Sequence, residues 1–103
     1  MPVFNRDRAI AQERITVDAT VGGVGLTMSK WIAPPLARTA TLTVETASCR
    51  YLTDGTAPTA TTGTLVYAGD VIELRNPSEI QYFRAIRTGA TSATIQVVYH
   101  GAG

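Results

Sequence analysis

The sequence predicts an all-β protein, built as an antiparallel β-sandwich of about seven short strands. Three observations lead to this prediction. Apolar and polar residues alternate over short runs, as on strands that bury one face, and β-branched residues occur throughout these runs. Turn signals built on Gly, Pro, Asn and Asp separate the runs at close, even spacing. No stretch shows the sustained 3.6-residue apolar spacing of an amphipathic helix.

The length of 103 residues fits one domain, which can bury roughly two-thirds of its unfolded surface in a single core. We divide it into an extended N-terminal arm over residues 1–14, the sandwich over residues 15–100 and a short tail over residues 101–103. The formal net charge is +1, and the arginines alternate with acids or stand apart, so no basic stripe marks a nucleic-acid site. The N-terminus lacks the pattern of a secretory signal, and no apolar run approaches ~18 residues, so we expect no membrane span.

The N-terminal arm has no clear period and mixes charges with single apolar residues. Three alternatives fit it: a short helix over residues 7–14, a disordered tail, or an arm that becomes ordered against a partner. Large apolar residues at the end of a chain are costly to expose, which favours the docking arm. Its candidate partner-binding residues are Val3, Phe4 and Arg6.

The first strand is expected over residues 15–20, where Ile15, Val17 and Ala19 alternate with polar residues. The glycine-rich segment 21–26 then breaks the pattern. It has neither the GxxxxGK(S/T) nor the GxGxxG spacing that a phosphate loop needs between a strand and a helix. We interpret it as a turn or a strand bulge.

An apolar cluster over residues 28–36 (MSKWIAPPL) leads into a pair of prolines. Because proline donates no backbone hydrogen bond and restricts the residue before it, residues 33–36 are predicted to form an extended connection or a sheet edge. Trp31, the only tryptophan, is either a core plug at one end of the sandwich or an interface anchor. Trp31, Pro34 and Pro35 complete the set of candidate partner-binding residues.

The central stretch, residues 41–68, carries the clearest strand and the strongest turn signal. Along the strand, Ala40, Leu42 and Val44 face one way while threonines face the other. A second run continues over residues 49–52.

A turn built on Asp54 and Gly55 follows this second run. Gly supplies a positive φ without a Cβ clash, and Asp can accept a hydrogen bond from the backbone two residues on. A Thr-rich connection pinned by Pro58 leads to a return run over residues 64–67. Asp54, Gly55 and Pro58 are therefore predicted to be structural turn residues.

Three further strands are predicted, over residues 71–74, 81–87 and 94–99, with residues 76–78 (Asn-Pro-Ser) as a turn before the second of them. Seven strands at this spacing are typical of an Ig-like or jelly-roll-like sandwich. The residues that share one face within each of these strands are Ile72 and Leu74, Phe83 and Ala85, and Ile95, Val97 and Tyr99.

Few residues in the chain suit catalysis or metal binding. Cys49, the only cysteine, falls in a strand-like run, where a small buried hydrophobe is expected. His100, the only histidine, lies near a chain end that we expect to fray, which cannot hold an imidazole against a nucleophile. One Cys and one His cannot supply the ligands of zinc, and no DxDxDG-type loop supports a calcium site at Asp54 or Asp70. We expect no enzyme activity, no metal and no cofactor.

The tyrosines offer one alternative function. Tyr51, Tyr67, Tyr82 and Tyr99 could build a platform on which sugars stack, although each is predicted in a strand where packing is the more common role. A carbohydrate-binding module that uses Tyr51, Tyr67 or Tyr82 is therefore kept as an alternative.

The segment RYLTDGTAPTATTGTLVYAGD (residues 50–70), followed by FRAIR (residues 83–87), resembles the strand-turn-strand signature of Ig-like modules appended to chitobiases and other secreted glycosidases. The match covers about half of the chain. It implies that the Asp-Gly turn and the following Pro-Thr join two strands of a sandwich, and it carries no catalytic residue.

A second resemblance extends over more of the chain. The segments ITVDATVGGVGLT, TATLTVETASCRYLTDGTAPTATTG, LVYAGDVIEL and FRAIRTGATSATIQVVYHG, in this order, are similar to short single-domain proteins that tailed bacteriophages encode among their virion structural genes. The resemblance implies a small β-sandwich used in many copies on a capsid or tail, and synthesis in the cytoplasm of a bacterial host. It transfers no binding residue position by position.

From these observations we expect a non-enzymatic virion structural protein. The first hypothesis is a capsid decoration or cement protein that binds the major capsid protein, or other virion proteins, at capsomer junctions as a homotrimer or another small oligomer. The alternatives are a component of the tail, baseplate or head-tail connector, and the carbohydrate-binding module. Nucleic acid and membranes are not expected among the partners.

Overall fold

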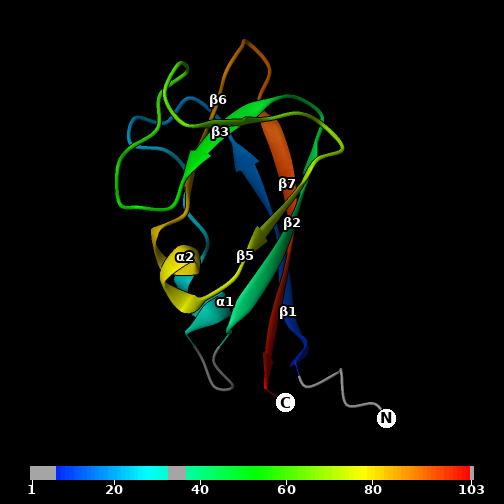
Figure 1. Ribbon diagram of the computed structural model, residues 1–103. Coiled ribbons are helices and arrows are strands. Elements are labelled where there is room, and N and C mark those ends of the chain that lie inside the picture. Colours follow the sequence, from blue (N-terminus) through cyan, green and yellow to red (C-terminus); the bar gives the residue numbers. More distant parts are fainter. Residues whose placement is uncertain (1–6, 33–36, 103) are drawn as a thin grey trace.

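Two antiparallel β-sheets face each other in the computed structural model, which describes residues 7–32 and 37–102 (Figure 1). One sheet has the strand order β1-β7-β2-β5 and the other the order β4-β3-β6. The predicted antiparallel sandwich of about seven strands is therefore confirmed. The strands are β1 (Asp7–Val17), β2 (Thr39–Glu45), β3 (Cys49–Leu52), β4 (Thr64–Val66), β5 (Val71–Leu74), β6 (Arg84–Arg87) and β7 (Ala93–Ala102), and the helices are α1 (Met28–Trp31) and α2 (Pro77–Tyr82).

The strand pairs are nested, as in one long hairpin folded over on itself. β1 pairs with β7, Val24 forms a single antiparallel bridge with Ala85 of β6, β2 pairs with β5, and β3 pairs with β4. β7 also pairs with β2, and β6 with β3, which wraps the hairpin into two sheets. This is the winding of a jelly roll, with Val24 in the place of an eighth strand. An Ig sandwich would keep its first two strands side by side, whereas here β7 separates β1 from β2.

The core lies between the two sheets and follows from alternation along the strands. On β2, Ala40, Leu42 and Val44 are fully buried, while the intervening residues face outward. Each fully buried side chain of this size contributes roughly 1.5–3 kcal/mol relative to exposure. The predicted shared faces on β5, on β7 and on β6 with the residue before it are confirmed as the inward faces. Their buried residues are Ile72, Leu74, Phe83, Ala85, Ile95, Val97 and Tyr99.

The predicted boundary between arm and sandwich is wrong. β1 begins at Asp7 and pairs with β7 from Asp7 opposite Ala102 to Val17 opposite Ala93, with an irregularity between Ala9 and Ala11. Residues 7–14 therefore belong to the sheet and do not form a helix. The first part of this strand was not predicted, because the charged residues of an edge strand do not look like a strand in the sequence. The irregularity also shifts the alternation of apolar and polar residues on which the prediction relied.

The predicted C-terminal tail is also partly strand. β7 continues to Ala102, and His100 lies opposite Ala9 of β1 and Thr39 of β2. His100 is thus held between two neighbouring strands, and the expectation that it lies in a frayed end is wrong. Pairing on both sides satisfies backbone groups that a free chain end would leave to water.

Helix α2 replaces the turn predicted at residues 76–78. Asn76 caps it, since the Asn76 Oδ1 accepts a hydrogen bond from the Glu79 backbone N–H at 2.9 Å. The Glu79 Oε1 in turn accepts from the Arg75 backbone N–H at 2.7 Å. Pro77 occupies the first turn, where its missing N–H costs nothing, and Ile80 anchors the helix in the core.

The two helices occupy residues that were predicted to form a strand or a connection. α2 takes the first part of the strand predicted over residues 81–87, so only β6 remains of it. α1 occupies the start of the apolar cluster before the prolines. In Figure 1 both helices lie toward the end of the sandwich where β1 begins and β7 ends. Within the described residues, neither helix is long and apolar enough to cross a bilayer.

Candidate functional site

The predicted partner-binding residues can be placed only in part. Trp31 is half-buried at the end of α1, where it packs against the core and also lines a surface pocket. It therefore has features of both alternatives, core plug and interface anchor. The other five, which lie outside the described residues, are Val3, Phe4, Arg6, Pro34 and Pro35.

The predicted turn residues lie in the long connection between β3 and β4. The Asp54 Oδ1 accepts a hydrogen bond from the Thr56 backbone N–H at 2.9 Å. Hydrogen bonds from Thr56 lower the pKa of the Asp54 carboxyl below its usual value. Gly55 has a φ of +91°, which a side chain would strain, and Pro58 is fully buried. These residues position the connection and form no site of their own.

A pocket of about 380 Å³ opens between α1, α2 and β6. We call it the Trp31 pocket. Its volume falls in the range of small-ligand sites in proteins. The residues that line it come from two separate stretches of the chain, 26–31 and 81–84, and they are Leu26, Trp31, Gln81, Tyr82 and Arg84.

A carboxylate fixes the helix that carries Trp31. The Glu13 Oε2 accepts hydrogen bonds from the Thr27 backbone N–H at 3.0 Å and from the Tyr99 hydroxyl at 2.5 Å, and the Glu13 Oε1 accepts from the Thr27 hydroxyl at 2.6 Å. Thr27 immediately precedes α1, so Glu13 ties the start of this helix to β1 and β7. Burial, together with the hydrogen bond to Glu13 and its charge, raises the pKa of the Tyr99 phenol well above its usual value.

The side chains on the other wall of the pocket are held by α2 and β6. Gln81 and Tyr82 end α2, whose position is set by the buried Ile80. Arg84 begins β6, and its guanidinium lies against Gly25. A Cβ at Gly25 would come within 1.8 Å of the Arg84 Nη1, so a larger residue at position 25 would require the flexible end of the arginine to move.

Hydrogen-bond donors predominate among the polar groups of the Trp31 pocket. The Trp31 Nε1 is buried and has no hydrogen-bond partner within the part of the chain that the structure describes. The Arg84 Nη1 reaches the Phe83 carbonyl only at 3.5 Å, which is long for a hydrogen bond. Tyr82 is 45% exposed, and none of the five lining residues is acidic. The pocket therefore presents one cation and an exposed aromatic ring, whereas the unpaired indole N–H has almost no accessible surface.

The tyrosines proposed as a sugar platform have different surroundings. Tyr51 stacks on Phe83 with ring centroids 5.7 Å apart, and burial is the main cause that raises the pKa of its phenol. Tyr67 is exposed beside the turn between β4 and β5. Tyr99 is fully buried. Of these four, Tyr82 is the one that lines the Trp31 pocket.

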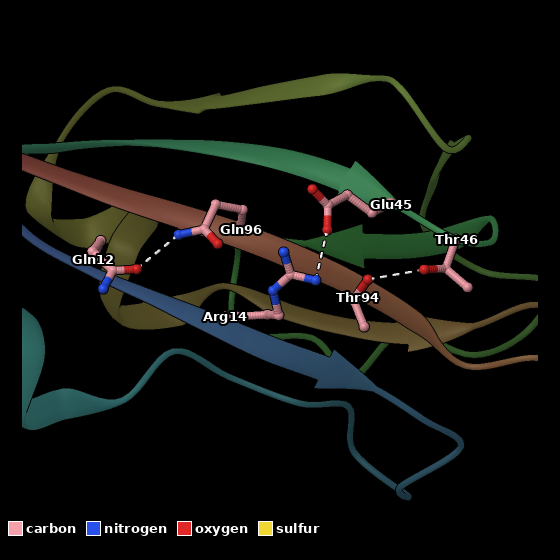
Figure 2. A network of polar contacts seen from close by, with 6 residues as sticks. All are labelled: Gln12, Arg14, Glu45, Thr46, Thr94 and Gln96. Carbon is pink, nitrogen blue, oxygen red and sulfur yellow. Dashed lines mark hydrogen bonds and ion pairs between the residues drawn. The ribbon is translucent and has the colours of Figure 1, made fainter.

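A second candidate surface is the outward face of the four-stranded sheet, drawn in Figure 2. The Gln96 Nε2 donates a hydrogen bond to the Gln12 Oε1 at 2.9 Å, which joins β7 to β1. The Arg14 Nη1 lies 3.0 Å from the Glu45 Oε1, and this ion pair links β1 to β2 across β7. We call the surface the polar face, and its named residues are Gln12, Arg14, Thr41, Thr43, Glu45, Glu73, Thr94 and Gln96.

Two more contacts extend these side-chain links between strands, which we call the lateral network. The Thr41 hydroxyl donates to the Glu73 Oε1 at 3.2 Å, joining β2 to the edge strand β5. The hydroxyls of Thr46 and Thr94 lie 3.0 Å apart at the end of β2 (Figure 2). Side chains from all four strands are thus tied to one another across the face.

Groups that could react or bind metal are dispersed. Within residues 7–32 and 37–102, no three His, Cys, Asp or Glu side chains gather as a metal ion would require. Cys49 is fully buried, and burial raises the pKa of its thiol to about 11. At neutral pH this cysteine is therefore a thiol rather than a nucleophilic thiolate.

Leu26, Gln81 and Arg84 were not singled out from the sequence. A usable signal existed for one wall of the pocket, because the order Asn-Pro-Ser-Glu over residues 76–79 is a helix-capping pattern that would have placed Gln81 on a helix. Arg84 had no such signal, since its role depends on the bare backbone of Gly25 in a distant segment.

No protein-family model matches the chain, and no curated protein and no solved structure matches it either. The features of the molecule that bear on its function are therefore the Trp31 pocket, the polar face and the winding of the chain.

Proposed function

We propose that the chain is a non-enzymatic structural protein of a tailed-bacteriophage virion, a decoration or cement protein that attaches to the capsid through the polar face. Jelly-roll winding supports this by analogy, because viral capsid domains commonly use it. The resemblance to small virion proteins of tailed phages points the same way.

The observation that carries the proposal is the lateral network on the polar face (Figure 2). Docking normally costs conformational entropy for each long side chain that becomes ordered. Here Gln12, Arg14 and Gln96 are already held by neighbours within the sheet, so less freedom is lost on contact. A surface ion pair such as Arg14–Glu45 adds little stability to the free protein, which fits a role in ordering the surface.

The size of the chain is sufficient for such attachment. A standard protein–protein interface buries ~800 Å² on each partner, and the described surface totals 5680 Å². One interface would therefore cover roughly a seventh of the molecule. Repetition of this contact around a symmetry axis adds avidity without new chemistry.

The test is an outward substitution at the centre of the polar face. Thr43 lies opposite Gln96 on one side and Val71 on the other, and Thr43→Arg places a bulky charge there. We expect at least a tenfold loss of co-sedimentation with shells of the encoding phage that lack the chain. The matched control is Thr64→Arg, the same change on exposed β4 of the other sheet. Unchanged binding by a folded Thr43→Arg protein would remove the polar face from the proposal.

Copy number separates decoration from the tail, baseplate and connector alternatives. A shell protein should be present on the order of hundreds of copies, and a ring at the tail or connector in about three to twelve. Quantitative mass spectrometry of intact particles gives this number. A ring-like count would replace the decoration hypothesis by the tail hypothesis.

The predicted arm contacts Val3, Phe4 and Arg6 need a separate variant. Deletion of residues 2–6 leaves β1 whole, because the strand begins at Asp7. If the arm contributes to docking, this deletion weakens co-sedimentation while the circular dichroism spectrum stays that of the intact chain. Full binding by the shortened chain would exclude the arm.

A further inference from the structure

Strand β1 gives the four-stranded sheet one long open edge. It has 11 residues, whereas β5 at the opposite edge of the same sheet has four. Within residues 7–32 and 37–102, β7 is the only strand that pairs with β1. Hydrogen bonds that reach this stretch from outside the sheet go to the Glu13 carboxylate and, beyond the strand, to the Asp18 carbonyl. The backbone N–H and C=O groups along the outer side of β1 are therefore available to another strand.

The charges of β1 are arranged so that the strand complements itself. Asp7 and Arg8 stand near its start, and Glu13 and Arg14 follow later. When two copies of β1 run antiparallel with Asp7 opposite Arg14 of the second copy, Arg8 lies opposite Glu13, and every one of these charges meets its opposite. Opposite charges stabilise a cross-strand pair and like charges destabilise it. Charges that protect an edge against other strands thus favour a second copy of the same strand.

The irregularity in β1 brings Asp7 and Arg14 to the same face of the sheet. In a regular strand, residues an odd number apart point to opposite faces. Here the register with β7 shifts between Ala9 and Ala11, and Asp7 lies opposite Ala102 while Arg14 lies opposite Gln96. Since position 102 and position 96 of β7 are an even number apart, positions 7 and 14 of β1 share the outward face. The self-complementary register is therefore compatible with the pleat of both strands.

The second charge pair obeys the same rule on the inward face. Arg8 lies opposite Gly101 and Glu13 opposite Val97, which are again an even number apart along β7. The centre of the register falls at the irregularity, so a twofold axis through this point relates the two strands and each charge pair occurs twice. A strand edge accepts one further strand, so this contact closes as a dimer and does not build a trimer.

We propose that the chain forms a twofold dimer in which β1 pairs antiparallel with β1 of a second copy, with Asp7 opposite Arg14 and Arg8 opposite Glu13. The two four-stranded sheets then form one continuous sheet, and the polar face extends across the dimer axis. A strand edge buries less surface than a standard interface, so we expect dimer and monomer to exchange with protein concentration. The dimer does not depend on attachment to a shell.

Sedimentation equilibrium of the isolated chain over a range of concentrations measures the association. Asp7→Arg places like charges opposite each other twice and should weaken the dimer about tenfold. Arg14→Asp should do the same, and the double variant Asp7→Arg/Arg14→Asp should return the affinity close to that of the unaltered chain, because it exchanges the two charges. The matched control is Arg75→Asp, the same change at an exposed position just after β5, which should leave the dimer unaltered. Circular dichroism of each variant establishes that it is folded.

Cysteine cross-linking tests the register itself. Ala9 and Gln12 are exposed, and in the proposed pairing Ala9 of one copy lies opposite Gln12 of the other. Ala9→Cys/Gln12→Cys should therefore give a disulfide-linked dimer under a mild oxidant, whereas Ala9→Cys alone should not. The native Cys49 is fully buried and stays out of this reaction.

Four results would overturn the proposal. They are a monomer at every concentration, a trimer, an Asp7→Arg protein that dimerises as the unaltered chain does, and a double charge variant that remains as weak as its parents. A cross-link through Ala9→Cys alone would likewise exclude this register. Because these measurements need no shell, their failure is distinguishable from a failure of the proposed function.

Discussion

Glu13 is a polar residue on which several parts of the fold depend. Its carboxylate joins the buried Tyr99 hydroxyl of β7 to Thr27 at the start of α1. Thr27 is exposed, but the hydroxyl of the buried Tyr99 has Glu13 as its acceptor, and an unsatisfied buried group costs more than an average hydrogen bond contributes.

Tyr99→Phe should therefore lower the free energy of unfolding by about 1–2 kcal/mol, and Glu13→Ala by more, because it also frees Thr27. Equilibrium unfolding in urea measures both changes. Glu73→Ala is the control, since it removes an exposed carboxylate that accepts from Thr41 and should change the value by less than about 0.5 kcal/mol. A Tyr99→Phe protein as stable as the unaltered chain would contradict this account.

Cys49 gives the stability a dependence on alkaline pH. Its thiol titrates near 9.0 when unfolded, and burial raises the pKa to about 11 in the fold. Between these values the unfolded chain loses the proton first, so the native state is fully favoured below about pH 9 and loses stability as pH rises toward 11. Tyr99, whose pKa is also raised, extends the loss above about pH 10.

Cys49→Ala should therefore flatten the fall in stability between about pH 9 and pH 10.5, even if its stability near pH 7 is lower because of lost packing. Urea unfolding at several pH values gives both quantities. Identical slopes for the variant and the unaltered chain would show that Cys49 does not titrate as inferred.

Among the elements, helix α2 depends on the contacts of its first turn. Asn76 and Glu79 satisfy backbone N–H groups at the start of the helix, and Ile80 buries the helix against the core. A helix of six residues has little stability of its own, so these contacts decide whether it forms.

Asn76→Ala should lower the free energy of unfolding by about 1 kcal/mol, the usual effect of a lost N-cap. It should also shift the indole resonance of Trp31, because α2 carries one wall of the pocket. Ser78→Ala is the matched control, as an exposed residue in the same turn. If both variants behave alike in urea and in the spectrum, the cap is not what holds α2.

At the scale of the whole molecule, stability depends on pairing the first strand with the last. A deletion that ends at residue 6 leaves every described pair of β1 with β7, whereas a deletion through residue 13 removes the pairs from Asp7 to Glu13. We expect the shorter deletion to keep a cooperative thermal transition and the longer one to abolish it. A cooperative transition in both would show that the N-terminal half of β1 is dispensable.

The fold class was predictable because burial on one face leaves a regular trace. On β2 and β7 every second residue is apolar and buried, so the strands are evident in the sequence. β1 was only partly predictable, because its outward residues include Gln12 and Arg14 and its alternation is interrupted near Ala9. The nested winding leaves no local pattern, since its partners lie at opposite ends of the chain.

The candidate site was less predictable for the same reason. Trp31 and Tyr82 were both singled out, but for two different functions, and nothing in their spacing indicated that they line one pocket. Their proximity results from α1 and α2 being fixed by separate contacts, one through Glu13 and one through Asn76.

Asp7 lies opposite Ala102, so the described ends of the chain finish side by side. A short glycine linker could therefore join them into a continuous backbone, and fresh ends could be opened at Thr61, on the exposed stretch between β3 and β4. Such a circular permutant would retain every strand pair. The ribosome, however, would make β4 to β7 before β1 to β3, the reverse of the present order. The order of synthesis could then be varied independently of the architecture that it produces.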